Sequence, residues 1–184
     1  MRIASLHAWF LAAIVAVAAL GCRRDDGGAK ANGPSYHNAV VMDVARIEFD
    51  DGDTFRYGKE HIRVLGIDTP EVREPDVGIF VDQPYGHVAA ESTHALIVRA
   101  GRVEIAYDGL DKYDRRLAHV FVDGELLGVK LLEMGLAYEN VSHFGDNGFP
   151  DLADRILRAA KDGPKPSFEP PHQWRRKNQK KMRD

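Results

Sequence analysis

Cysteine is almost absent from this chain of 184 residues, which contains only Cys22. A single cysteine excludes a disulfide framework within the chain and a zinc site built from several cysteines. The eight histidines show no zinc-type spacing with a matching partner. The sequence also lacks a Ser–His–Asp arrangement, a phosphate-cradling glycine loop and a dinucleotide fingerprint. The chemistry must therefore come from other residue types.

Long hydrophobic runs are lacking too. Residues 8–20 form a run of 13 apolar or small residues, whereas a membrane-spanning helix needs about 20. We interpret residues 1–21 as a cleaved export signal, because Arg2 precedes the run and Gly21-Cys22 follows it. The end of the run resembles a bacterial lipobox, which implies a lipidated Cys22. The expected product is a cell-envelope lipoprotein, on the periplasmic or outer-membrane side, attached to the membrane by its N-terminal lipid. An ordinary secretory signal and a secreted protein are the alternative.

Net charge is small, −3 at neutral pH, but its distribution is uneven. The last 21 residues sum to +5 and residues 22–163 to −9. The chain is 44% hydrophobic and 29% charged, which excludes a disordered or polytopic membrane protein. We predict a flexible tether at 22–35, one globular domain at 36–163, and a proline-rich, then basic, tail at 164–184. The tail is expected to attract nucleic acid.

The globular part contains strand patterns first and helix patterns later. The predicted strands are residues 40–49, 54–57, 61–67, 102–107 and 117–122. The predicted helices are residues 87–100, 125–134 and 151–161. Five short strands with helices interposed late predict an α+β, mainly β, fold: a closed five-stranded barrel of the OB type with about three packed helices.

Three short segments carry polar residues that a bare barrel does not need: residues 51–54, 63–71 and 111–116. In the first, a carboxylate at a hairpin tip is often only turn chemistry. In the second, period-two alternation places Arg63 on the same strand face as Leu65 and Ile67. Such an arginine either extends to a rim or lines a polar pocket. The third segment, taken alone, is a charged loop.

Together the segments hold the groups needed for metal-assisted hydrolysis of a phosphodiester. A hard divalent cation needs oxygen ligands, which Asp53 and Asp68 offer. A phosphate needs fixed positive donors, which the guanidinium groups of Arg63 and Arg115 provide. A carboxylate such as Glu71 can position or deprotonate the attacking water.

The sequence resembles the staphylococcal nuclease, or thermonuclease, family. The matching stretches occur in the order of the family and span about residues 40–161. They are DGDT at 51–54, RVLGIDTPE at 63–71, Tyr85-Gly86, DKY-x-R at 111–115 and GLA at 135–137. The resemblance implies an OB-fold barrel and a calcium-dependent nuclease that cuts DNA or RNA at the 5′ side of the phosphorus, leaving 3′-phosphates.

The resemblance also implies roles for individual residues. Asp53 and Asp68 would supply carboxylates to the calcium ion, and Thr69 a backbone carbonyl. Arg63 and Arg115 would hold the scissile phosphate.

Three further positions take roles in the same way. Glu71 would orient or deprotonate the water, and Lys112 and Tyr113 would lie beside the nucleotide. Asp114 stands where the family usually has glycine; if its φ is positive, aspartate tolerates the strain better than a branched residue.

Residues 140–147 lack the paired tyrosines of the family, and His143 and Phe144 could stack on a base instead. Two alternatives to the enzyme remain open. One is a non-catalytic OB- or Tudor-like module that binds nucleic acid or protein; the other is an envelope protein with a structural calcium site. A monomer is the default expectation.

Overall fold

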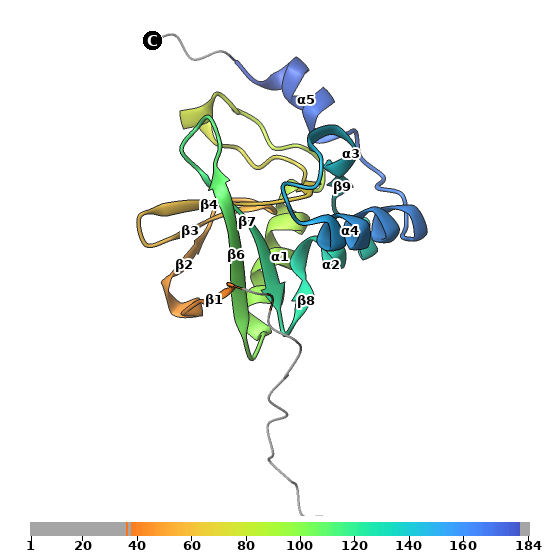
Figure 1. The fold of residues 1–184 in the computed structure, drawn as a ribbon. Coiled ribbons are helices and arrows are strands. Elements are labelled where there is room, and N and C mark those ends of the chain that lie inside the picture. Colours follow the sequence, from red (N-terminus) through yellow and green to blue (C-terminus); the bar gives the residue numbers. More distant parts are fainter. Residues whose placement is uncertain (1–35, 37, 181–184) are drawn as a thin grey trace, which may run out of the picture.

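A computed structural model describes residue 36 and residues 38–180. The predicted signal, the predicted lipidation site Cys22, the predicted tether and the last four residues of the tail lie outside the described residues. The described chain forms a curled sheet with helices packed beside it (Figure 1). No helix in this part of the chain combines the length and the apolar character needed to cross a bilayer.

The strands are short. They are β1 (Val40–Val41), β2 (Ile47–Phe49), β3 (Thr54–Tyr57), β4 (Glu60–Val64), β5 (Ile67–Asp68), β6 (Val103–Leu110), β7 (Arg116–Val122), β8 (Glu125–Leu126) and β9 (Tyr138–Glu139). The α-helices are α1 (Gly86–Arg99), α2 (Leu127–Glu133), α3 (Val141–Phe144), α4 (Pro150–Asp162) and α5 (Pro171–Asn178). Two 3₁₀ turns, η1 (Val44–Arg46) and η2 (Pro75–Val77), complete the elements.

The main sheet has the strand order β1-β6-β7-β4-β3-β2, with β8 paired to β7. Only β4 and β7 are parallel, and the other pairs are antiparallel. β1 and β2 lie at opposite ends of this order although only residues 42–46 separate them in the chain. The sheet therefore curls until one stretch of chain meets both of its edges, which gives the predicted OB-like α+β fold. β5 and β9 form a separate pair.

The predicted number of five strands is too small. Two predicted strands are each divided, and the two-residue strands β8 and β9 were not predicted; β8 occupies the start of the predicted helix at 125–134. The first predicted strand is interrupted by η1, where the Asp43 side chain accepts a hydrogen bond from the Ala45 amide at 3.1 Å. The third is broken at Gly66, whose φ of +83° ends β4 before β5 begins. The three predicted helices correspond to α1, α2 and α4, whereas α3 and α5 were not predicted.

The core lies between the curled sheet and the first, second and fourth helices. α1 buries Ala89, Thr93 and Ile97, which are four residues apart and share one face. α2 packs against β7, α1 and α4. Phe55, Ile62, Ile105, Val120, Leu131 and Ile156 are fully enclosed. This core supports the loops at one end of the sheet, where the polar segments 51–54 and 63–71 meet.

Candidate active site

The turn between β2 and β3 is braced by Asp51. Its Oδ1 accepts hydrogen bonds from the amides of Asp53, at 2.8 Å, and Thr54, at 2.6 Å. Of the carboxylates at this hairpin tip, Asp51 is therefore the one that stabilises the turn. Burial raises the pKa of Asp51, although the charges of Arg63 and Arg115 oppose this effect.

Asp53 points inward from this turn and is 1% exposed. Its Oδ2 accepts a hydrogen bond from the Thr69 amide at 2.6 Å. A Cβ atom at Gly52 would lie 2.8 Å from Thr69 Oγ1, so only glycine lets the turn approach this closely. The β2–β3 turn and the segment after β5, about 16 residues apart in the chain, are thus joined.

Arg63, on β4, lies between the two predicted metal-binding acids. It forms an ion pair with Asp53 and another with Asp68, at 2.9 Å, and donates to the Ile67 carbonyl at 3.2 Å. Only 14% of its side chain is exposed. Arg63 is therefore surrounded by polar partners and does not extend to a rim.

Gly66 makes this arrangement possible. With a positive φ, it reverses the chain between β4 and β5 and returns Asp68 to Arg63. A Cβ atom at this position would also lie 2.3 Å from Ile156 Cδ1. The contact between Arg63 and Asp68 thus depends on a glycine at position 66, which is required both by the positive φ and by the lack of space for a Cβ atom.

Glu71 is 8% exposed and receives an unexpected partner. Arg175, on α5, pairs with both oxygens of Asp68, through Nη1 at 3.1 Å and Nη2 at 2.9 Å. Its Nη1 also donates to Glu71 Oε1. Burial raises the pKa of Glu71, and the Arg175 charge partly offsets this.

We call this group the acid–arginine cluster; its members are Asp53, Arg63, Asp68, Glu71 and Arg175. Four of the five were predicted from the sequence. The fifth was assigned only to the basic tail, although the PPHQWRR stretch around it also resembles exported members of the family. Its contacts cross more than 100 residues of chain, so local spacing gave no signal.

Arg115 lies in the loop between β6 and β7 and outside direct contact with the cluster. Its Nε and Nη2 both lie 2.8 Å from Asp111 Oδ2, and 30% of its side chain is exposed. The Arg115 and Lys112 cations lie over the Tyr113 ring, at 5.6 and 4.8 Å from its centroid. Asp114 has a φ of +60°, as its glycine-like position suggested. The predicted substrate residues therefore form a second, more exposed group.

His143 and Phe144 lie on α3 with their rings edge to face at 4.5 Å. Phe144 is 67% exposed. Its ring is therefore accessible, as stacking on a base would require.

The donor chemistry of the cluster fits a hard cation. Asp53 and Asp68 offer carboxylate oxygens, the ligands that calcium prefers. Within the described residues, however, no three acidic, histidine or cysteine side chains are grouped as a ready-made cation site. Arginine side chains engage these carboxylates instead.

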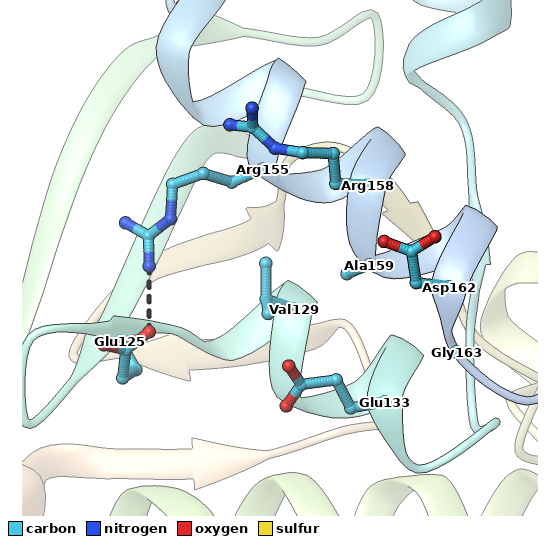
Figure 2. A pocket seen from close by; sticks show the side chains of 8 residues that line it. All are labelled: Glu125, Val129, Glu133, Arg155, Arg158, Ala159, Asp162 and Gly163. Carbon is cyan, nitrogen blue, oxygen red and sulfur yellow. Dashed lines mark hydrogen bonds and ion pairs between the residues drawn. The ribbon is translucent and has the colours of Figure 1, made fainter.

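A hollow of about 460 Å³ lies elsewhere, between α2 and α4. Figure 2 shows its charged walls, where Arg155 on α4 reaches Glu125 at 2.8 Å. Glu133 and Asp162 also line it. The hollow shares no residue with the acid–arginine cluster and has side chains of both charges, so it does not point to a site for a polyanion.

Comparison with known proteins agrees with this geometry. Residues 61–162 match the family model described as "Staphylococcal nuclease homologue". A thermonuclease of Staphylococcus hyicus is 32% identical over 131 residues, 68% of this chain and 74% of the relative. A thermonuclease of Staphylococcus intermedius is 40% identical over 93 residues, 47% of this chain and 53% of the relative. Endonuclease YncB of Bacillus subtilis is 38% identical over 110 residues, 56% and 50% of the two chains.

The chain therefore spans about half the length of the last two relatives. The family model, in contrast, covers more than half of this chain and includes most of the acid–arginine cluster. The chain belongs to the staphylococcal nuclease family.

Proposed function

We propose that this protein is a calcium-dependent nuclease that hydrolyses DNA or RNA at the 5′ side of the phosphorus and leaves 3′-phosphates. The observation that carries the proposal is the convergence of the buried Asp53 and Asp68 on the half-buried Arg63, with the buried Glu71 beside them. The relatives named thermonuclease and endonuclease support it.

Asp53 and Asp68, with the backbone carbonyl of Thr69, would hold the calcium ion. When bound, calcium supplies positive charge that offsets the negative charge of the phosphate in the transition state. Two buried carboxylates without a counter-charge are unfavourable. In the structure Arg63 and Arg175 supply this counter-charge, and a calcium ion would add to it at the carboxylate oxygens.

The two predicted phosphate-binding arginines have different tasks. Arg63 is fixed by buried partners, so its position is defined before substrate binds. Arg115 must exchange Asp111 for the phosphate. This ion pair is more accessible to solvent than the pair of Arg63 with Asp68, so its exchange costs less than breaking a pair of Arg63 would. Lys112 and Tyr113 lie on the same loop and would meet the adjacent nucleotide.

Glu71 is the group that would accept the proton of the attacking water. The water oxygen bonds to phosphorus, the bond from phosphorus to the 5′-oxygen breaks, and that oxygen takes a proton from solvent. Because burial raises the pKa of Glu71, its carboxylate is a stronger base than an exposed glutamate.

A matched pair of variants tests the proposal. Glu71→Gln keeps the shape of the side chain but removes the base, and we expect kcat to fall by about 10²- to 10⁴-fold. Glu74→Gln changes an exposed acid on the same loop and should leave kcat unchanged. Near-normal hydrolysis by Glu71→Gln would contradict the assignment. Binding of nucleic acid by the wild type without hydrolysis would favour the non-catalytic module.

We also propose, from the sequence, that the nuclease acts at the cell envelope as a monomer. Export would place it outside the cytoplasm, where extracellular nucleic acid is the accessible substrate. The lipidated Cys22 stays a prediction.

A further inference from the structure

The C-terminal strap, which we define as residues 164–180, is built into the fold beside the candidate active site. Its first half is held by two hydrogen bonds to its backbone carbonyls. Gln83 Nε2 donates to Glu169 O at 2.6 Å, and the Tyr138 hydroxyl donates to Phe168 O at 2.7 Å. The buried Phe168 ring packs against the rings of Tyr85 and Tyr138, at 5.6 and 5.5 Å.

The second half of the strap contains α5, which lies across the loop end of the sheet (Figure 1). Trp174 is 7% exposed. Beyond the helix, the Lys180 amide donates to Gly78 O at 2.9 Å, and Gln179 Nε2 donates to Val77 O at 2.8 Å. A Cβ atom at Gly78 would lie 2.1 Å from Lys180 O. The loop between β5 and α1 therefore contacts the strap on both sides of α5, through Gln83 before the helix and through Val77 and Gly78 after it.

The strap is tied to Glu71 twice. The side chain of Gln83, which is 2% exposed, accepts a hydrogen bond from the Glu71 amide at 3.2 Å and donates one to the Glu169 carbonyl. Arg175 holds the carboxylate of Glu71 through Nη1. The backbone and the side chain of Glu71 are thus both fixed by one C-terminal element.

The guanidinium of Arg175 is suited to this task because it is a rigid fork. One edge, Nη1 and Nη2, spans both oxygens of Asp68, and Nη1 also reaches Glu71. The two acids are therefore held at a fixed distance by one planar group. A lysine ammonium has the charge without the fork. The neighbouring Arg176 is exposed and makes no ion pair with any residue that the structure describes.

We propose that Arg175 is a positioning residue of the hydrolytic site, which acts by holding the Glu71 carboxylate in register with Asp68. This inference rests on the proposed nuclease function. It assigns to the C-terminal strap a part in the site that its basic composition alone does not reveal.

The test compares Arg175→Ala, Arg175→Lys and the control Arg176→Ala in the full-length chain, with a short single-stranded oligonucleotide and calcium. We expect Arg175→Ala and Arg175→Lys to lower kcat by about 10- to 100-fold, with little change in KM. Arg176→Ala removes one charge of the basic tail but no contact with Glu71 or Asp68, so its kcat should match the wild type. Added guanidinium ion should restore part of the kcat of Arg175→Ala, because it can occupy the space that the side chain leaves.

Folding is followed in the same variants by fluorescence. Trp9 and Trp174 are the two tryptophans of the chain, so in a Trp9→Phe background the emission reports on α5. An unchanged emission with a lowered kcat supports positioning. Wild-type kcat in Arg175→Lys, or a kcat that rises in Arg175→Ala because the strap obstructs the site, would overturn it. A wild-type chain without hydrolysis would instead refute the proposed function, so the two failures are distinguishable.

Discussion

Gly86, the first residue of α1, offers a way to move Glu71 without touching its side chain. A Cβ atom at Gly86 would lie 2.3 Å from the carbonyl oxygen of Glu71 and 2.9 Å from its carbonyl carbon. The same carbonyl accepts a hydrogen bond from the Gln83 amide at 2.9 Å. Gly86→Ala must therefore displace the backbone of Glu71, and the close approach explains why Tyr85-Gly86 opens this helix.

The magnitude follows from the overlap. Cβ atoms essentially never come within 3.0 Å of such an atom, so α1 and Glu71 must separate by at least about 0.7 Å. A misplacement of about 1 Å at a reacting group can cost about 10²-fold in rate. We therefore expect kcat to fall by about 10- to 100-fold in Gly86→Ala. Alanine is about 1 kcal/mol better than glycine within a helix, so a loss of helix propensity cannot explain this decrease.

The assay is steady-state hydrolysis of a short oligonucleotide, with thermal unfolding of the same samples. Gly109→Ala on β6 is the control, because a Cβ atom there meets nothing within 4 Å; its kcat should match the wild type. A wild-type kcat in a folded Gly86→Ala variant would refute the dependence of hydrolysis on the position of Glu71.

Two further predictions concern stability. Arg63→Ala leaves the buried Asp53 without its ion pair and should cost about 3–5 kcal/mol, whereas Arg115→Ala should cost about 1 kcal/mol or less; equal costs in urea unfolding would contradict the difference in burial. Burial lowers the pKa of His119 to about 4 from 6.5, so the unfolded chain binds the proton more tightly and stability falls as pH decreases between these values. From pH 7.5 to 4.5 the wild type should lose about 2–3 kcal/mol more than His119→Gln, and parallel pH profiles would refute this.

Much of the site was predictable because its spacing is local. Asp53 lies at a tight hairpin turn, and Asp68 follows Arg63 by five residues. Each of these placements could therefore be predicted from a short stretch of sequence. The strand boundaries were less accurate. The first predicted strand bends at η1, because curling the sheet requires one stretch to meet both edges. The alternation of polar and apolar residues does not predict such a bend.

Arg175 could not be predicted because its role depends on contacts distant in the chain. A proline-rich segment followed by lysines and arginines is typical of an exposed tail, and only the tertiary fold shows Trp174 buried and Arg175 against Asp68. The pairing of Arg115 with Asp111 was also missed. A charged loop permits several such pairs, and the turn at Asp114 selects this one.

The most direct test of the central claim is hydrolysis of single-stranded and duplex DNA by the wild-type chain, first with calcium and then with a chelator of divalent cations. We expect hydrolysis with calcium, products with 3′-phosphate ends, loss of activity on chelation, and recovery when calcium is restored. Hydrolysis that chelation leaves unchanged would contradict it.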